Sequence, residues 1–270
     1  MKVVIIGNNV SGTFTAQNIR SLNDEAEIEV YTQEKYPYYT RVKLPELISD
    51  KVNINDLIVF KEDWYQNKQI NLYLNKKVSK IAPTNKTIQI GGDNIEYDKL
   101  VLALGSMPNI PPIKNAVEMK DQKKGVFTLR SIDDALEIKE FIKTKDVQKA
   151  VIIGGGLLGL ELANQINDCN LDTTVVEFFP RLLPRQLDEE CSVMLREEIE
   201  SRGINVVLDA VTEEILGNGR VNGIKLKIGK RFDAEVVLIQ AGIRPIVDLA
   251  KEANIQTNKG IIVNEFLETS

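Results

Sequence analysis

The sequence predicts an α/β fold made of two doubly wound halves, one nested inside the other. The first observation is a glycine-rich turn directly after an apolar strand, which occurs at Gly7–Gly12 and again at Gly154–Gly159. The second is an apolar strand that ends in Gly-x-x-Pro, at Asp98–Pro108 and at Glu235–Pro245. Such glycines and prolines stop a strand where the chain has to leave it. The same order of signals in both halves indicates a duplicated fold.

The later glycine turn has the full spacing of a dinucleotide-binding motif. Gly154, Gly156 and Gly159 stand in G-x-G-x-x-G register after an apolar strand. In this motif the first glycine permits a tight turn, the second lets a pyrophosphate approach the backbone, and the third lets the helix pack on the strand. The phosphates then lie at the helix N-terminus, where free amides favour an anion. The alternative interpretation is a glycine-rich turn that binds no ligand.

An acidic residue follows the next strand of this half. The strand over Thr173–Val176 leads directly to Glu177. A carboxylate at this place accepts hydrogen bonds from a ribose 2′-hydroxyl and repels a 2′-phosphate, so it predicts NADH rather than NADPH. Arg181 and Arg185 follow in a proline-bounded loop, where they either contact the adenosine side of the nucleotide or are surface charges.

The amino-terminal glycine turn is imperfect, because Asn9 stands between Gly7 and Gly12 at the second glycine position. Asparagine tolerates left-handed backbone conformations, so we expect the turn to be kept. Its side chain occupies space that a pyrophosphate would use. Glu34 follows the next strand and suits a ribose ligand, with Thr32 as a rival for that place. The alternative is a motif that no longer binds a nucleotide.

Each half also contains turn signals before its last strand, in residues 77–97 and 212–232. We expect each stretch to be a small antiparallel meander inserted before the last parallel strand. The expected domains are residues 1–112 with 243–270, and residues 113–242.

Composition excludes several classes of protein. The 270 residues are 43% hydrophobic, which is enough for two cores. A net charge of −5 without a basic face argues against nucleic acid as a partner. No apolar run reaches the ~18 residues of a membrane span, so we expect a cytoplasmic protein. The absence of histidine excludes histidine-based metal sites, and Cys169 and Cys191 form no C-x-x-C pair, so we expect two buried, redox-inactive thiols.

Longer segments resemble the pyridine nucleotide–disulfide oxidoreductase superfamily over essentially the whole chain: GGGLLGLELA, VVEFFPRLLPRQLD, YDKLVLALGSMP, VFTLRSIDDA and KGIIVNEFLETS. The segment EKYPYYTRVKLPELI is most similar to NADH:rubredoxin oxidoreductases and to the flavoprotein region of assimilatory nitrite reductase large subunits. The resemblance implies an FAD domain formed by both chain ends and an NADH domain inserted between them.

Two departures from this family concern its redox chemistry. Val42 stands where thiol-dependent relatives have a redox cysteine, and Leu157 where disulfide reductases have a gating tyrosine. A flavin without a partner thiol cannot carry out disulfide chemistry. A third departure is that relatives continue after the segment ending at Ser270 with an Ala-x-Gly-Asp turn that holds the flavin, so we expect an incomplete FAD domain and weak FAD affinity.

The resemblance implies an enzyme that passes a hydride from NADH to FAD and then single electrons to a small carrier protein such as rubredoxin. One alternative is the flavoprotein portion of an assimilatory nitrite reductase, with a sirohaem domain as electron acceptor. Another is an NADH-binding fragment without a competent flavin. Whether the sequence is a fragment of a longer protein is left open.

The resemblance also implies roles for individual residues. Glu161 is similar to a glutamate on the nicotinamide side, or is an exposed helix acid. Arg41 and Lys43 resemble flavin-contacting cations, which stabilise a reduced anionic flavin, or are solvated loop charges. The catalytic candidates are therefore Glu161 and Lys43, and no metal ligand is expected. The cofactor-binding candidates are Gly7, Asn9, Gly12, Glu34, Arg41, Lys43, Ala103, Gly105, Gly154, Gly156, Leu157, Leu158, Gly159, Glu177, Arg185 and Gly242.

Overall fold

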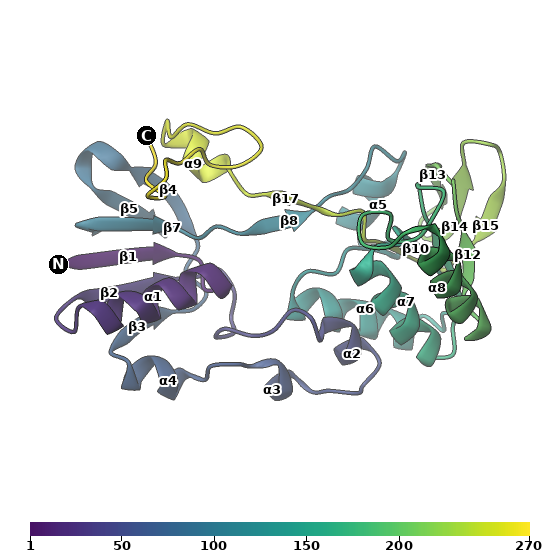
Figure 1. The fold of residues 1–270 in the computed structure, drawn as a ribbon, viewed down its shortest axis with the longest axis horizontal. Coiled ribbons are helices and arrows are strands. Elements are labelled where there is room, and N and C mark those ends of the chain that lie inside the picture. Colours follow the sequence, from purple (N-terminus) through teal and green to yellow (C-terminus); the bar gives the residue numbers. More distant parts are fainter. The chain divides into compact units, whose positions relative to one another are not determined.

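The computed structural model describes all residues from 1 to 270, and the chain divides into two compact units (Figure 1). The first unit contains Met1–Thr40, Asn55–Met107 and Arg244–Ser270, and the second contains Arg41–Ile54 and Pro108–Ile243. Residues 41–54, which we assigned to the terminal domain, lie in the second unit because helix α2 (Leu44–Ile48) packs there on helices α6 (Ile132–Thr144) and α7 (Leu157–Asp168).

The first unit is built on a four-stranded parallel sheet with the order β3-β2-β1-β7. Its strands are β1 (Lys2–Ile6), β2 (Glu27–Tyr31), β3 (Ile70–Tyr73) and β7 (Lys99–Leu102). Helix α1 (Val10–Leu22) connects β1 to β2; the remaining helices of this part of the chain are α3 (Ile54–Leu57), α4 (Glu62–Asn67), η1 (Pro83–Asn85) and α9 (Asp248–Glu252). After Lys2, strand β1 is apolar and buried from Val3 to Ile6, as a strand covered on both faces has to be.

The second unit repeats this plan with a five-stranded parallel sheet in the order β12-β11-β10-β16-β9. Its strands are β9 (Val126–Phe127), β10 (Lys149–Ile153), β11 (Asp172–Val176), β12 (Asn205–Val207) and β16 (Val236–Ile239). Helix α7 connects β10 to β11 and helix α8 (Glu189–Ser201) connects β11 to β12, while α5 (Ala116–Asp121) precedes β9. The two parallel sheets confirm the predicted duplicated α/β fold.

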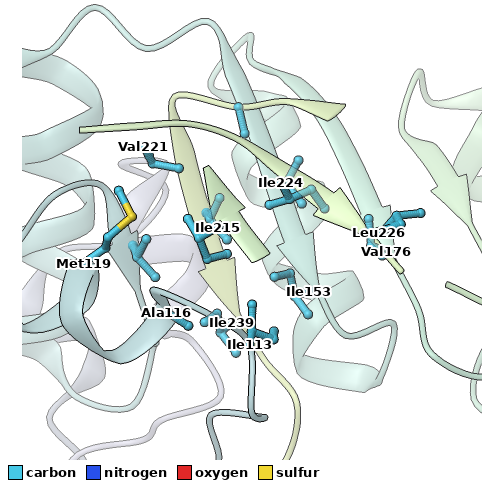
Figure 2. Close-up of a cluster of buried hydrophobic side chains, with 14 of the residues drawn as sticks. Ile113, Ala116, Met119, Ile153, Val176, Ile215, Val221, Ile224, Leu226 and Ile239 are labelled. Atoms are coloured by element: carbon cyan, nitrogen blue, oxygen red, sulfur yellow. The ribbon is translucent and has the colours of Figure 1, made fainter. Parts of the chain in front are cut away.

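Both predicted meanders are present, each directly before the last parallel strand of its half. The first contains β4 (Val78–Ala82), β5 (Thr87–Ile90) and β6 (Asp93–Glu96), and the second contains β13 (Thr212–Gly217), β14 (Val221–Leu226) and β15 (Arg231–Asp233). In the second unit, buried Ile215 and Ile224 of the meander pack with Ile153 and Ile239 of the parallel sheet (Figure 2). The meander therefore covers one face of this sheet and completes its core.

The chain passes between the units at β8 (Ser106–Pro108) and β17 (Ile243–Pro245), which pair in a two-stranded sheet. These are the two Gly-x-x-Pro segments. Gly105 and Gly242 precede the crossing strands with φ of +72° and +89°, a conformation that glycine adopts without steric cost.

The helices carry local start signals. Ser131 Oγ accepts a hydrogen bond of 3.2 Å from Asp134 N, and Asp134 Oδ2 accepts one of 2.8 Å from Ser131 N, which is a complete capping box for α6. Asp188 accepts a hydrogen bond from Cys191 N at the start of α8.

No helix of the structure combines the length and the apolar character that crossing a membrane requires.

The two cysteines are not both buried, so that expectation was wrong. Cys169 is half-buried, whereas Cys191 is exposed because the buried face of α8 is formed by Ser192 and Ile199.

Candidate functional site

The glycine turn of the second unit needs glycine at two positions for steric reasons. Gly154 has a φ of +115°, and a side chain there would collide with the carbonyl oxygen of Gln240. A side chain at Gly159 would collide with the carbonyl oxygen of Gly154. The Gly154 contact lies against the residue that follows β16, and the Gly159 contact brings α7 close to the end of β10, so the first and third glycines of the motif serve the tight turn and the helix packing that the spacing predicts.

Gly156 differs from the other two because nothing in the chain requires it to be glycine. It is the N-cap of α7 with φ −79° and ψ 176°, which any residue adopts. A Cβ built at Gly156 meets no atom within 4 Å. Open space therefore lies at the helix N-terminus, where free backbone amides and the helix dipole favour an anion. A dinucleotide pyrophosphate fits this position.

A cavity of about 540 Å³ opens beside this turn within the second unit. The structure brings together five of the predicted residues in its lining: Gly154, Gly156, Glu177, Arg185 and Gly242. Leu157, Leu158, Gly159 and Glu161 are not part of this lining. Sequence reasoning missed Gly155, Phe178 and Phe179, which also line it, although the run of three glycines and the aromatic pair after Glu177 were visible signals.

The Glu177 carboxylate is held in place by backbone amides. Its side chain is buried, and its Oε2 accepts a hydrogen bond of 2.5 Å from Gly155 N while its Oε1 accepts one of 2.9 Å from Phe179 N. Each carboxylate oxygen can accept a further bond, so ribose hydroxyls still find acceptors here. A Cβ at Gly155 would lie 2.8 Å from Leu182 Cδ2 and 3.2 Å from Glu177 Oε2. Gly155 is therefore the residue that lets the acid approach the turn.

The first unit repeats the steric pattern of the glycine turn. Gly7 has a φ of +111° and no room for a side chain against the carbonyl oxygen of Ala103, and Gly12 has none against the carbonyl oxygen of Gly7. Asn9 is the N-cap of α1 with φ −98° and ψ −166°. Our reason for expecting the turn to survive was therefore wrong, since Asn9 is extended and the positive φ falls on Gly7. Asn9 is the position equivalent to Gly156 of the second unit. Its side chain therefore occupies space that is open beside Gly156.

Asn8 is a residue of this turn that sequence reasoning missed. It is buried, and its Oδ1 accepts hydrogen bonds from Thr13 Oγ1 at 3.0 Å and from the Tyr65 hydroxyl at 3.1 Å. Its Nδ2 has no hydrogen-bond partner in the protein. A buried donor without a partner costs about 1–3 kcal/mol, so a ligand oxygen that reached Asn8 Nδ2 would relieve this cost.

The two rival ribose ligands of the first unit differ in burial. Thr32 is buried, and its hydroxyl accepts a hydrogen bond of 3.2 Å from Glu34 N. Glu34 is half-buried, and its Oε2 accepts a 2.6 Å hydrogen bond from the Tyr39 hydroxyl. Of the two, Glu34 keeps the more accessible oxygens, so the geometry favours it as the ribose-binding residue.

The candidates for flavin and nicotinamide contacts lie in or near segment 41–54 and on α7. Arg41 donates a hydrogen bond from Nη1 to the carbonyl oxygen of Arg130. Lys43 is the N-cap residue of α2 and is exposed. Glu161 is exposed on α7, where its Oε1 accepts a hydrogen bond from Gln165 Nε2. None of the three lines the cavity at Gly156.

Neither thiol has the environment of a reactive cysteine. Burial raises the pKa of the Cys169 thiol, with nearby Asp168 adding to the effect. The hydrogen bond with Asp188 raises the pKa of the Cys191 thiol. Because thiolate is the nucleophilic form, both cysteines are poorly suited to redox exchange.

Two parallel sheets, each with a glycine turn directly after one of its inner strands, β1 and β10, define a two-domain dinucleotide-binding fold. The chain belongs to the pyridine nucleotide-disulphide oxidoreductase family, whose model matches residues 1–270. This confirms the resemblance found in the sequence.

Three relatives show how far the similarity extends. The NAD(P)H nitrite reductase of Bacillus subtilis is 37% identical over 270 residues, which cover 99% of this chain and 33% of the relative. The NADH-rubredoxin oxidoreductase of Clostridium acetobutylicum is 32% identical over 270 residues, 100% of this chain and 65% of the relative. The solved structure of an NAD-dependent persulfide reductase from A. fulgidus superposes with a TM-score of 0.90 at 32% identity, covering 100% of this chain and 51% of that one. The chain therefore spans about a third to two thirds of the proteins it matches.

Proposed function

We propose that this chain is the nucleotide-binding part of an FAD-dependent oxidoreductase that takes a hydride from NADH and passes electrons to a one-electron carrier protein. The observation that carries the proposal is the arrangement at Gly156, where open space at a helix N-terminus lies in one cavity with the buried acid Glu177. This combination suits a pyrophosphate and an unphosphorylated ribose.

In this proposal the residues of the second unit bind and orient NADH. The N-terminus of α7 receives the pyrophosphate, and Glu177 accepts hydrogen bonds from the adenosine ribose. Arg185 lines the same cavity, where its cationic side chain suits the phosphates of the adenosine half. Glu161 lies further along α7, one turn beyond the N-terminus, and is assigned to the nicotinamide side.

The first unit is proposed to hold FAD in the same manner. The N-terminus of α1 receives the flavin nucleotide's pyrophosphate, Asn8 supplies an amide donor, and Glu34 accepts from the ribose. Arg41 and Lys43 belong to segment 41–54 of the second unit, and the resemblance assigns them to the flavin ring, where a cation stabilises negative charge. When bound, FAD accepts a hydride and releases its electrons singly, which is chemistry that protein side chains do not supply.

The acceptor is proposed to be a carrier protein of the rubredoxin type. Support comes from the NADH-rubredoxin oxidoreductase of Clostridium acetobutylicum, and from Val42, which is 71% exposed and leaves no thiol for disulfide transfer. The second candidate is electron supply to a nitrite-reducing domain. It is supported by the nitrite reductase of Bacillus subtilis, which matches 99% of this chain.

The first experiment is the absorption spectrum of the purified protein with FAD in excess, compared with the spectrum of the same amount of free FAD. The proposal expects a bound flavin band that is bleached by NADH under anaerobic conditions and restored by oxidised rubredoxin. A protein that binds NADH but no flavin would contradict the proposal and indicate a nucleotide-binding fragment. Bleaching by NADH without reoxidation by rubredoxin, combined with reoxidation by a nitrite reductase sirohaem domain, would favour the second candidate.

A further inference from the structure

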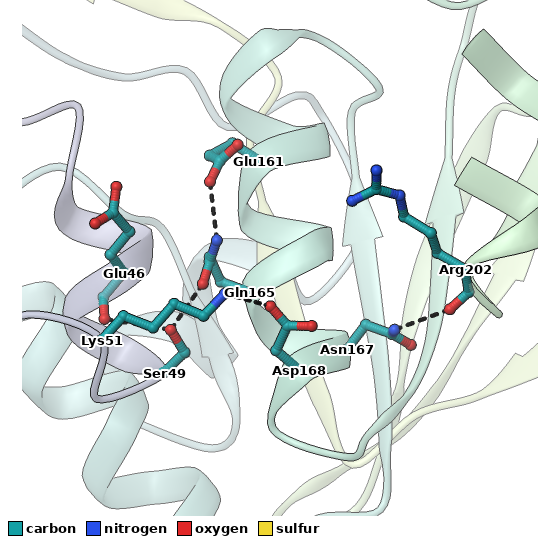
Figure 3. A network of polar contacts seen from close by, with 8 residues as sticks. All are labelled: Glu46, Ser49, Lys51, Glu161, Gln165, Asn167, Asp168 and Arg202. Atoms are coloured by element: carbon teal, nitrogen blue, oxygen red, sulfur yellow. Dashed lines mark hydrogen bonds and ion pairs between the residues drawn. The ribbon is translucent and has the colours of Figure 1, made fainter. Parts of the chain in front are cut away.

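A polar network on one face of α7 joins Glu161 to the end of α2 (Figure 3). Gln165 lies one turn after Glu161 and is only 4% exposed. Its Nε2 donates a hydrogen bond of 3.0 Å to Glu161 Oε1, and its Oε1 accepts one of 2.7 Å from Ser49 Oγ. Both ends of this buried amide are therefore satisfied, by residues from two segments far apart in the sequence.

The charge on Glu161 sets the orientation of the Gln165 amide. An ionised carboxylate only accepts hydrogen bonds, so it requires the NH₂ end of the amide to face it. The carbonyl end then faces Ser49, whose hydroxyl carries a single proton. That proton is directed to Gln165 at 2.7 Å rather than to the carbonyl oxygen of Glu46 at 3.2 Å. The acid on α7 thus determines, through Gln165, how the end of α2 is held.

The charged groups around this network are largely paired with one another. Lys51 Nζ lies 2.5 Å from Asp168 Oδ2, and Lys139 forms an ion pair with Asp50. The hydrogen bond to Asp168 raises the pKa of Lys51, and the negative charge of Glu161 adds to the rise. The charge of Glu161 therefore interacts with Lys51, but the hydrogen bond that Glu161 accepts comes from Gln165.

We propose that Gln165 is a positioning residue that fixes Glu161 and the α2 segment in a single arrangement. The inference rests on the proposed function, in which Glu161 faces the nicotinamide while Arg41 and Lys43, on the same segment as Ser49, contact the flavin. An exposed glutamate otherwise loses side-chain entropy when it adopts one rotamer, and a bond from a buried amide offsets that loss. Gln165 thereby fixes the position of the Glu161 carboxylate relative to segment 41–54, which contains Ser49.

The test combines two variants of the 270-residue protein, each measured for flavin reduction and for thermal unfolding. Gln165→Leu keeps the volume of the side chain and removes both hydrogen bonds. It is expected to slow anaerobic flavin reduction by NADH about fivefold, close to 1 kcal/mol, with the Kd for NADH unchanged. Its melting temperature is expected to fall by about 2–4 °C.

The second variant is the exchange Glu161→Gln with Gln165→Glu, which restores the hydrogen bond between the two positions and moves the carboxylate by one helical turn. Because the moved carboxylate is buried at position 165, the melting temperature is expected to stay below the wild-type value, and flavin reduction is expected to stay slow because the acid no longer lies at position 161. Flavin reduction at the wild-type rate by the exchanged protein would show that the carboxylate need not be held at position 161 and would overturn the proposal. Slower reduction in Gln165→Leu that results entirely from weaker NADH binding would also overturn it.

The matched control is Gln122→Leu at the C-cap of α5. Gln122 Nε2 donates to Glu118 Oε1 at 3.3 Å with the same spacing along the helix, but both residues are exposed. Neither measurement is expected to change. If the wild-type protein reduces no flavin, the proposed function fails. The melting temperatures of the variants then test whether Gln165 is coupled to Glu161. Strong non-additivity between Glu161→Gln and Gln165→Leu then supports the coupling, and additive effects refute it.

Discussion

Replacement of Gly156 by valine should separate nucleotide binding from folding. The position has φ −79° and ψ 176°, and a Cβ there meets no atom within 4 Å. The fold therefore tolerates the side chain, and valine at the N-cap in place of glycine should cost only about 1 kcal/mol of stability. The pyrophosphate, by contrast, loses its place at the start of α7.

The expected loss of affinity follows from the contacts that the branched side chain blocks. A hydrogen bond from a backbone amide to a charged phosphate contributes about 1.5–3 kcal/mol. Losing one such bond, at about 2 kcal/mol, weakens NADH binding by roughly 30-fold, and losing two abolishes measurable binding. Calorimetric titration of NADH into Gly156→Val measures this, and the far-ultraviolet circular dichroism of the variant verifies that it is folded.

Two further variants make the comparison sharp. Gly260→Val is the matched control, because Gly260 also has no atom within 4 Å of a built Cβ and lies outside the cavity, so its NADH affinity should equal that of the wild type. Gly154→Val should instead impair folding, since Gly154 has a φ of +115° and no room beside Gln240. A folded Gly156→Val protein that binds NADH with wild-type affinity would refute the placement of the pyrophosphate.

Three other outcomes are expected. The protein should prefer NADH over NADPH by at least tenfold, about 1.4 kcal/mol, because Glu177 repels a 2′-phosphate, and equal affinities in parallel titrations would contradict this role. Thiol reagents should leave NADH oxidation unchanged, because the pKa values of both Cys169 and Cys191 are raised and thiolate is scarce; stoichiometric inactivation that NADH prevents would reveal a catalytic cysteine. Asn9→Gly should raise FAD affinity or leave it unchanged, since it clears space at the start of α1, and a weaker FAD titration would mean that the Asn9 side chain is itself a ligand contact.

The fold could be predicted well from local patterns. The strand expected over Thr173–Val176 is β11 (Asp172–Val176) in the structure, and both meanders lie in the stretches that turn residues marked. Apolar periodicity, glycine spacing and strand breakers act over a few residues, so they are legible in the sequence. The steric roles of Gly154 and Gly159 followed from spacing for the same reason.

What the tertiary structure decided depends on residues distant in the sequence. The Gly155 amide bonds to Glu177 because β11 lies beside β10, and Ser49 bonds to Gln165 because α2 packs on α7. No periodicity records such a pairing. The backbone conformation of Asn9 was misjudged because Gly7 takes the positive φ that closes the turn. The sequence by itself determined which elements form and where glycine is required. Long-range packing decided which side chains those elements bring into contact. The reason is that a contact energy depends on both partners, whereas a local sequence pattern contains only one of them.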